Sequence, residues 1–287
     1  MLCSDKWTDY ELIDCSDGER LERWGGYTLV RPDPQVIWKN CRLAKEWARP
    51  DGRYIRRGGG GDWSPDGRFP EKWTIGYERL GLRFEIRPMG FKHVGLFPEQ
   101  AVNWEWIHET VSGAGREVRI LNLFAYTGGA TVAAASAGAS VCHVDASKGM
   151  VAYAKRNAEL SGLSSAHIRY IVDDCVKFCE REKRRGNRYD GVIMDPPSYG
   201  RGPGGEKWTL EDSVDGLVGL ASELLTPEPL FFVLNSYTTG LSAATTGYVL
   251  MKNLSRLGGT VESHELGLPV SATGGILPSG STSRWKA

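Results

Sequence analysis

The sequence has no long apolar run and no excess charge of either sign. No stretch approaches the ~20 apolar residues that a transmembrane helix needs, and residues 1–6 lack the apolar core of a signal peptide. Lys plus Arg and Asp plus Glu both number 35, so the formal net charge is zero. Zero net charge argues against strong non-specific binding to nucleic acid. We therefore expect a cytoplasmic protein without a membrane partner, and the oligomeric state stays open.

Cysteine is scarce, and its spacing is not that of a metal site. The six cysteines are Cys3, Cys15, Cys41, Cys142, Cys175 and Cys179. None of them forms a Cys-x-x-Cys pair, and the two that are four residues apart on a predicted helix have no second pair to complete a metal site. Reduced thiols, several of them buried, and no metal ion are expected.

Length and composition are those of a soluble globular protein. At 287 residues the chain exceeds a typical single domain, so one large domain or two unequal domains are expected. Hydrophobic residues make up 41% of the chain and charged residues 24%, which are ordinary fractions.

The stretch that organises the chain is residues 118–129. Residues 118–124 form a short apolar run that predicts a strand buried on both faces, as in a parallel sheet. A turn containing Gly128 and Gly129 follows, and then a helix start. Amide groups at such a helix start can face a nucleotide-like ligand, because glycine lets the backbone approach it closely. Asp145 ends the next predicted strand, where an acid can accept hydrogen bonds from ribose hydroxyls.

A second motif, at residues 192–199, ends in Asp195-Pro196-Pro197-Ser198-Tyr199. Two prolines remove two N–H donors and fix the backbone, so the sheet must stop there. Asp195 would then lie in a rigid backbone segment at the edge of the sheet. There it could accept hydrogen bonds from an amino or ring group of a planar substrate.

From residue 118 onward, predicted strands and helices alternate. Strands are expected at 118–124, 140–145, 167–172, 189–195 and 229–235, and helices at 129–137, 147–161, 174–184, 207–225 and 241–256. This alternation indicates an α/β fold with a mostly parallel sheet and helices on both faces. The ligand crevice is expected at the carboxyl ends of the strands, where Asp145, Asp173, Asp174 and Asp195 all fall. Residues 259–266 and 281–286 predict two further strands.

Residues 1–97 predict a small β-rich N-terminal domain, with residues 98–287 forming the second domain. Strands are expected at 27–30, 73–77 and 82–86. Six of the ten tryptophans lie in this region, either in its core or stacked on bases. Residues 58–67 are glycine-rich and predict a flexible loop. With Arg53, Arg56 and Arg57 just before it, this loop is the candidate RNA-facing element.

Together these motifs resemble the class I S-adenosylmethionine-dependent methyltransferases. The residues that carry the resemblance are 122–129, 144–147, 173–174 and 195–199. Residues 91–100 and 201–208 resemble segments of the group that contains the bacterial large-subunit rRNA methyltransferases, the latter a signature of a less characterised branch. The resemblance covers about residues 8–287 and implies a Rossmann-like sheet that binds S-adenosyl-L-methionine.

The resemblance also assigns site residues. The methionine and sugar side of the cofactor falls to Phe124, Tyr126, Thr127, Gly128 and Gly129, the ribose to Asp145 with Ala146 and Ser147, and the adenine to Asp174 with Asp173. Phe97 and Gln100 are expected near the cofactor, although Gln100 can instead cap a helix, and Asp173 and Asp174 can be N-caps. The catalytic segment is Asp195, Pro196, Pro197, Ser198 and Tyr199, where Ser198 displaces the tyrosine by one position from the Asp-Pro-Pro-Tyr type of motif.

The predicted activity is methylation of a base in RNA, ribosomal RNA in particular, with direct transfer. The cytosine-5 members carry a catalytic cysteine after the fifth strand, whereas this chain has no cysteine after Cys179. Other hypotheses are a methyltransferase acting on a small molecule or protein, a nicotinamide-dependent dehydrogenase and a non-catalytic RNA-binding module. Asp195-Pro196-Pro197 and the absence of Gly-x-Gly-x-x-Gly argue against the dehydrogenase.

Overall fold

The computed structural model describes residues 1–58, 60–201, 207–238 and 240–287. The chain divides into two compact units. We call the first the sheet unit; it contains Met1, Asn103–Leu266 and Gly280–Ala287. The second, the N-terminal unit, contains Leu2–Val102 and Gly267–Ser279. No helix in the described part of the chain is long and apolar enough to span a membrane.

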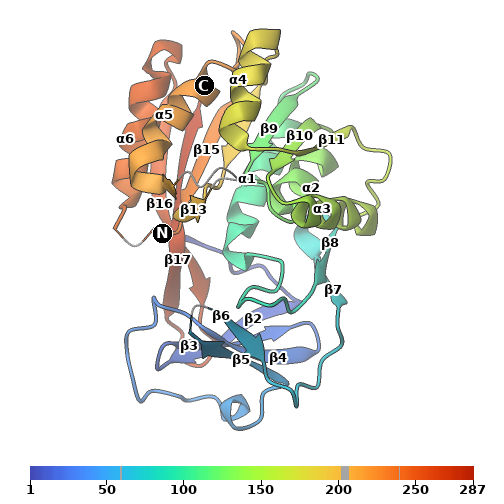
Figure 1. Cartoon of the computed structure of the whole chain (residues 1–287), viewed down its shortest axis with the longest axis vertical. Coiled ribbons are helices and arrows are strands. Elements are labelled where there is room, and N and C mark those ends of the chain that lie inside the picture. Colours follow the sequence, from blue (N-terminus) through green and yellow to red (C-terminus); the bar gives the residue numbers. More distant parts are fainter. Residues whose placement is uncertain (59, 202–206, 239) are drawn as a thin grey trace. The chain divides into compact units, whose positions relative to one another are not determined.

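The sheet unit is built on the predicted alternation of strands and helices (Figure 1). Its elements in chain order are α1 (Ala101–Ser112), β9 (Arg119–Leu123), α2 (Gly129–Ser136), β10 (Ser140–Asp145), α3 (Lys148–Leu160), β11 (Ile168–Val172), α4 (Cys175–Arg185), β12 (Gly191–Met194), β13 (Tyr199–Arg201), β14 (Lys207–Thr209), α5 (Leu210–Ser222), β15 (Phe231–Ser236), α6 (Ala243–Leu254), the 3-10 turn Ser255–Leu257, β16 (Thr260–Pro269) and β17 (Ile276–Lys286). Every strand and helix predicted from residue 118 onward is confirmed, with ends that differ by a few residues.

The large sheet has the strand order β1-β16-β17-β15-β12-β9-β10-β11, where β1 (Leu2–Cys3) belongs to the N-terminal unit. Strands β15, β12, β9, β10 and β11 are parallel, and β17 pairs with β15 antiparallel. The chain runs outward from β9 to β11 and then returns to the other side of β9 with β12. The strand order therefore reverses between β9 and β12, which is where open parallel sheets bind their ligands.

Alternate strand residues pack against different helices, which explains the continuous apolar runs. Leu121, Leu123 and Met194 point into a core shared with α4, α5 and α6. Ile120 and Ile193 point into a second core, with α1 and α2. Because both faces are covered, the central strands are mostly apolar, and the buried polar residues Asn122 and His143 are both hydrogen-bonded to Thr131.

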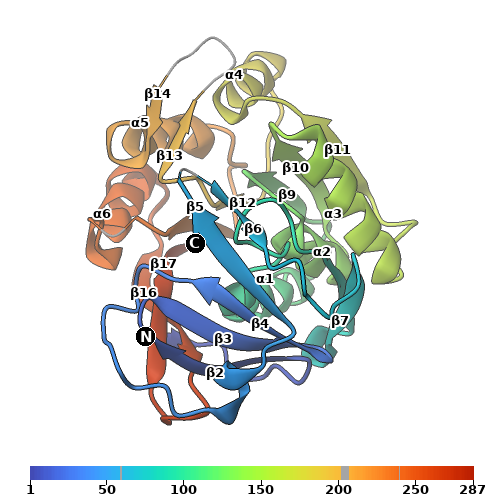
Figure 2. The ribbon, with the colours of Figure 1, turned by 60° about the horizontal axis from the view of Figure 1, so that its bottom comes forward.

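The N-terminal unit contains a five-stranded sheet with the order β2-β3-β4-β5-β6 (Figure 2). Its strands are β2 (Tyr10–Ser16), β3 (Glu19–Trp24), β4 (Tyr27–Pro32), β5 (Gly52–Arg57) and β6 (Gly60–Trp63), and β7 (Trp73–Tyr77) pairs with β8 (Leu82–Ile86). Three 3-10 turns, Lys45–Ala48, Glu78–Leu80 and Pro98–Gln100, complete it. The three strands predicted in this region are confirmed, and the β-rich character with them.

The predicted flexible loop at residues 58–67 is wrong for residues 60–63. These residues form β6, antiparallel to β5. A Cβ at Gly61 would lie 2.4 Å from the Ile55 carbonyl oxygen and 2.7 Å from the Tyr54 ring. Glycine there permits a close backbone approach within a hairpin, a role that composition alone does not distinguish from a loop.

The boundary predicted between residues 97 and 98 stays a prediction. The N-terminal unit also takes in Gly267–Ser279, which is the end of β16, the turn after it and the start of β17. Ser271 and Ala272 donate backbone hydrogen bonds to the carbonyls of Leu12 (3.0 Å) and Ile13 (2.9 Å) in β2. This pairing joins segments more than 250 residues apart in the sequence, so no local pattern indicates it.

A buried charge cluster stabilises the N-terminal unit. Glu22 is fully buried, and Arg31 donates to it from Nε (2.6 Å) and Nη2 (2.8 Å). Tyr10 donates at 2.8 Å, and the Arg20 guanidinium lies 3.4 Å away. Burial opposes ionisation of Glu22, but the two guanidinium groups outweigh it and lower its pKa to about 2.

We predict that Glu22→Gln lowers the free energy of unfolding by about 3–5 kcal/mol, because it removes the buried carboxylate that pairs with both guanidinium groups and leaves Arg20 paired only with Asp33. Urea denaturation measures the loss. Since the pKa of Glu22 is lower in the folded state, its contribution is complete above the unfolded pKa and disappears as the pH falls toward 2. Glu11→Gln is the matched control: Glu11 forms a half-exposed pair with Arg23, worth less than about 1 kcal/mol. Equal losses in both variants would contradict the assignment.

Candidate functional site

The carboxyl ends of four neighbouring strands meet at the point where the strand order reverses. The Ala125 amide donates to the Val144 carbonyl (3.1 Å), and the Asp173 amide donates to the Asp145 carbonyl (3.1 Å). The Asp195 amide donates to the Leu123 carbonyl (3.4 Å). These contacts join the segments that follow β9, β10, β11 and β12, so the predicted acidic strand ends share one edge of the sheet.

The turn after β9 has an unusual backbone. Phe124 and Tyr126 have φ values of +53° and +50°, in the left-handed region that non-glycine residues seldom adopt, and Gly128 has φ +84°. Each such non-glycine residue costs about 1–3 kcal/mol unless its surroundings hold it in place. Here the Phe124 amide donates to Cys175 Sγ at 3.3 Å, and the Gly128 amide donates to the Ala125 carbonyl at 3.0 Å. Strain of this kind gathers at binding sites, where the backbone itself presents groups to a ligand.

Asp145 holds this turn through two hydrogen bonds, and each of its carboxylate oxygens can accept another. Its Oδ2 accepts from the Tyr126 amide (2.9 Å) and its Oδ1 from the Ser147 amide (2.8 Å). A carboxylate oxygen has two lone pairs, so each oxygen can accept one more hydrogen bond, which matches a pair of ribose hydroxyls. Burial raises the pKa of Asp145, and the two amide hydrogen bonds oppose that rise.

The two glycines of the turn pack where a side chain has no room. A Cβ at Gly128 would lie 2.8 Å from Ala154 Cβ and 3.2 Å from Ala154 Cα, and one at Gly129 would lie 2.6 Å from the Trp104 indole. A contact from α3 also holds the turn, because the Asn157 side chain donates a hydrogen bond to the Thr127 carbonyl at 2.8 Å. Packing against α3 and α1 therefore requires glycine at both positions.

We predict that Gly128→Ala weakens cofactor binding at least tenfold and destabilises the fold by about 1–3 kcal/mol, since the Ala154 backbone must move. Calorimetric titration and thermal denaturation test this. Gly216→Ala is the control: it lies within α5, a Cβ there would have no other atom within 4 Å, and the variant should gain about 0.5–1 kcal/mol. Unchanged affinity in Gly128→Ala would show that the turn does not approach the ligand.

The remaining predicted cofactor residues have several structural roles. Ser147 is the N-cap of α3, and Ala146 beside it is exposed. Asp174 is the N-cap of α4, with Oδ1 accepting from the Lys177 amide at 2.9 Å. Asp173 forms an ion pair with Arg181 and accepts from the Asp174 amide at 2.9 Å. The capping alternative therefore holds for Asp174, and its role toward adenine stays a prediction that depends on its other oxygen.

Phe97 and Gln100 lie in the N-terminal unit, and their role near the cofactor stays a prediction. Gln100 ends the 3-10 turn Pro98–Gln100, and its amide donates to the Phe97 carbonyl at 3.1 Å.

The segment after β12 is held by contacts that the sequence motifs do not indicate. Trp208 Nε1 donates to the Pro197 carbonyl (2.8 Å), and the Leu210 amide donates to the Ser198 carbonyl (3.1 Å). Thr238 Oγ1 donates to Ser198 Oγ (2.7 Å). The Tyr199 side chain is 52% exposed and therefore accessible to a planar substrate. Most of the signature segment at 201–208 lies outside the described residues.

Trp208 also connects the two motifs of the site, because its ring lies 5.7 Å from that of Phe124. Sequence reasoning missed it as a site residue, together with Asn157 and Thr238. The only signal for Trp208 is its place in the signature segment, and the other two residues carry none. Contacts of this kind join residues that are far apart in the sequence.

The cysteines of the sheet unit are poor nucleophiles. Burial raises the pKa of Cys142 to about 11 and that of Cys179 to about 12, and it raises the pKa of Cys175 further. In the described ranges, no group of three or more His, Cys, Asp or Glu side chains is arranged to hold a metal ion.

This strand order and strand-end site define a nucleotide-cofactor fold of the methyltransferase type. The chain belongs to the S-adenosylmethionine-dependent methyltransferase family, which it matches over residues 20–240. This family is described by its dependence on S-adenosylmethionine, which argues against the dehydrogenase hypothesis. The acceptors left on Asp145 and the close-packed glycine turn fit this cofactor.

Individual relatives agree with the family. The solved structure of a SAM-dependent methyltransferase from Agrobacterium tumefaciens is 39% identical, with a TM-score of 0.93 over 99% of this chain and 92% of that one. A structure from Streptococcus mutans, 19% identical with a TM-score of 0.76 over 99% of this chain and 76% of that one, has the same fold. Ribosomal RNA large subunit methyltransferase K/L from Shewanella frigidimarina is 32% identical over 152 residues, 52% of this chain and 20% of that protein. The chain thus spans about a fifth of the length of that relative.

Proposed function

We propose that this protein methylates a base in RNA, ribosomal RNA in particular, by direct transfer from S-adenosylmethionine. The observation that carries the proposal is the rigid Asp195-Pro196-Pro197-Ser198-Tyr199 segment beside the cofactor turn, with an exposed tyrosine at its end. The similarity to a relative named for ribosomal RNA methylation supports the choice of substrate.

The cofactor supplies a methyl group activated on a sulfonium, so the protein has to bind, aim and align. Asp145 holds the ribose, and the amides of the Gly128 turn lie along the methionine side. Asp195 accepts a hydrogen bond from an amino or ring N–H of the base and so orients the nitrogen that receives the methyl. Tyr199 stacks on the base after it leaves the RNA stack. Trp208 holds the segment through its hydrogen bond to the Pro197 carbonyl and its contact with the Phe124 ring.

The burial and raised pKa values of the cysteines of the sheet unit support direct transfer of the methyl group, without a covalent bond between the protein and the base. A covalent attack on a pyrimidine ring needs a thiolate at the site, and the three cysteines of the sheet unit are buried with raised pKa values. We therefore expect no denaturation-stable adduct between the protein and RNA that contains 5-fluorocytosine. Such an adduct would disprove the direct mechanism.

The substrate is tested by mass mapping of nucleosides in rRNA from a strain that lacks this protein. We expect one methylated base to be absent, and to return when the purified protein and S-adenosylmethionine are added to that rRNA. If the rRNA is fully modified without the protein, ribosomal RNA is not the substrate, and a small-molecule or protein acceptor becomes the better hypothesis.

A further inference from the structure

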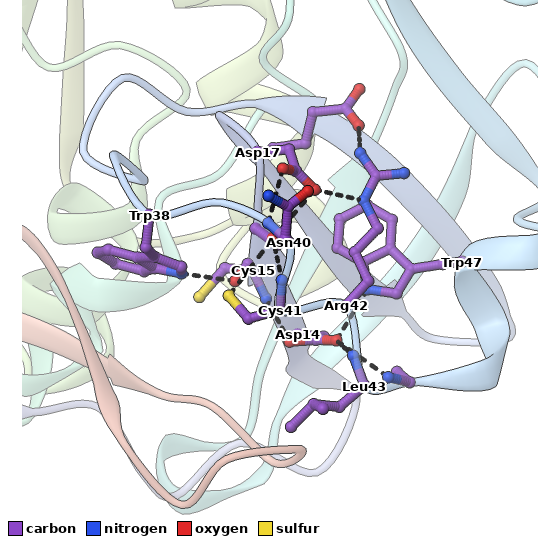
Figure 3. Close-up of polar contacts among 12 residues, drawn as sticks. Asp14, Cys15, Asp17, Trp38, Asn40, Cys41, Arg42, Leu43 and Trp47 are labelled. Atoms are coloured by element: carbon purple, nitrogen blue, oxygen red, sulfur yellow. Dashed lines mark hydrogen bonds and ion pairs between the residues drawn. The ribbon is translucent and has the colours of Figure 1, made fainter.

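Residues 34–49 of the N-terminal unit, which we call the anchored segment, are fixed on β2 by one buried carboxylate. Asp14 is fully buried, and its Oδ2 accepts from the Leu43 amide (2.7 Å), the Ala44 amide (3.0 Å) and Trp47 Nε1 (2.8 Å), as Figure 3 shows in part. Its Oδ1 accepts from the Cys15 amide at 2.8 Å. Three donors from the segment on one carboxylate oxygen leave its second half little freedom.

A second set of contacts fixes the first half of the segment (Figure 3). Trp38 Nε1 donates to the Cys15 carbonyl (2.7 Å), and the Asp17 amide donates to the Trp38 carbonyl (2.9 Å). The Asn40 amide donates to Asp17 Oδ1 (3.0 Å), and Asp17 and Asn40 both have φ +57°. The Trp38 ring is therefore held in one orientation by its own N–H group.

What this rigid segment presents to solvent is apolar and aromatic. Ile37 is 81% exposed, Leu43 65% and Trp38 37%. Trp24 and Trp47 are buried in the same unit, so Trp38 differs from them in leaving a face open. Large apolar side chains that are exposed on an ordered segment are typical of a contact surface. Hydrogen bonds that order the segment before contact reduce the conformational entropy lost on binding.

The charge of the segment indicates the partner. Between residues 36 and 49 there are four cations, Lys39, Arg42, Lys45 and Arg49, and one acid, Glu46. Arg42 is paired with Asp17 and Glu19. Lys39, Lys45 and Arg49 are exposed, and within the described ranges no ion pair is found for them. Arg56 and Arg57 at the end of β5, in the same unit, are also exposed. Of the acids that contact the segment, Asp14 and Asp17 are occupied by hydrogen bonds and an ion pair, and Glu46 is outnumbered by the four cations, so the segment is cationic.

We propose that the anchored segment is an RNA-contact surface, with Trp38 stacking on an unpaired base and Lys39 and Lys45 contacting phosphates. An exposed aromatic side chain in a segment rich in cations is an arrangement by which proteins bind single-stranded RNA. A protein partner would need acidic groups to match the same cations, whereas RNA supplies them at every nucleotide. The inference rests on the proposed function, because it takes RNA as the partner of this methyltransferase.

The charge component is tested with the double variant Lys39→Gln/Lys45→Gln. Fluorescence anisotropy measures binding of the full-length protein to a labelled single-stranded 20-nucleotide RNA over a range of salt concentrations. We expect binding about tenfold weaker at low salt and a log–log salt slope shallower by about 1.4, since each lost phosphate contact contributes about 0.7 for single strands. The control Lys155→Gln/Lys286→Gln removes the same charge from exposed sites in α3 and β17 and should leave both quantities unchanged.

The stacking component is tested with Trp38→Ala and Trp38→Phe. Alanine removes the ring and should weaken binding about tenfold without changing the salt slope. Phenylalanine loses the hydrogen bond to the Cys15 carbonyl but keeps an aromatic face, so most of the affinity should return. If both variants bind alike, stacking is not the contribution of Trp38, and that part of the proposal is overturned.

Failure of this surface can be distinguished from failure of the proposed function. One outcome is that the parent protein binds and methylates RNA while the variants of the anchored segment match it in affinity and salt slope. The RNA-contact role of the segment is then overturned, and the proposed methyl transfer remains. If the parent protein binds no RNA probe, the surface is overturned, and the mass mapping of rRNA nucleosides decides the proposed function separately. If the variants of the anchored segment lose self-association in sedimentation but keep their RNA affinity, the segment is a contact between protein molecules instead. Calorimetry with S-adenosylmethionine confirms in each variant that the sheet unit is intact.

Discussion

Replacing Asp145 by alanine should weaken S-adenosylmethionine binding about 100-fold or more. The change removes the acceptor for two ribose hydroxyls, and each hydrogen bond to a charged group is worth about 1.5–3 kcal/mol. It also removes the acceptors for the Tyr126 and Ser147 amides, which hold the strained turn in place. Isothermal titration calorimetry measures the loss. Asp215→Ala in α5 is the control, because that carboxylate is exposed and pairs only at the surface with Lys252 and Asn253.

The same residue gives the site a pH dependence. The ionised carboxylate is the better acceptor for ribose hydroxyls, and burial raises the pKa of Asp145 above that of an ordinary aspartate. Affinity should therefore be constant above the raised pKa and fall as the pH drops through it, starting at a higher pH than an ordinary aspartate would give. Asp145→Asn has no carboxylate to titrate, so the ratio of parent to variant affinity isolates this group from the titration of the cofactor. A ratio independent of pH would contradict the assignment.

Replacing Asp195 by alanine should slow methyl transfer about 10²–10³-fold and leave cofactor affinity within about threefold. The expected size is that of removing one oriented hydrogen-bonding group from a transition state. Cofactor binding should persist because the Asp145 and Gly128 contacts remain. Transfer of a radiolabelled methyl group to RNA in single-turnover conditions measures the rate, and calorimetry measures the affinity.

Two companion variants sharpen this test. Asp195→Asn keeps a carbonyl oxygen as an acceptor and should recover part of the rate. Glu211→Ala removes an exposed acid from the first turn of α5 and should have the rate of the parent protein. Full activity in Asp195→Ala would withdraw Asp195 from the substrate site, while a joint loss of cofactor affinity would make it a structural residue of the strand end.

Local patterns predicted the sheet unit well, for a physical reason. A strand covered on both faces is mostly apolar, and a helix packed on one side must repeat its apolar residues at the helical period. The run from Val192 to Met194 and the Asp-Pro-Pro stop after it are typical of a buried strand that ends at the edge of a parallel sheet. Asp145 was predictable because the end of a parallel strand always lies at the same edge of the sheet.

The site was predicted only to the extent that its residues are close in the sequence. The strained φ values of Phe124 and Tyr126 are held by contacts with Cys175 at the start of α4 and Asp145 at the end of β10. Trp208 reaches Pro197 across the β13–β14 pair, and Asn157 reaches Thr127 from α3. No pattern within a short window indicates such contacts.

By itself, the sequence determined the order of the main strands and helices from residue 118 onward and the acids at the strand ends, because each follows from periodicity and chain connectivity. Tertiary structure alone decided the order of the strands within the sheet, which backbone is strained, which tryptophan holds the segment after β12 and which stays exposed, and that residues 60–63 form a strand. It also decided that Glu22 is buried between two arginines. The physical reason is that packing and charge pairing depend on distances in space, and only the folded chain fixes those for residues far apart along it.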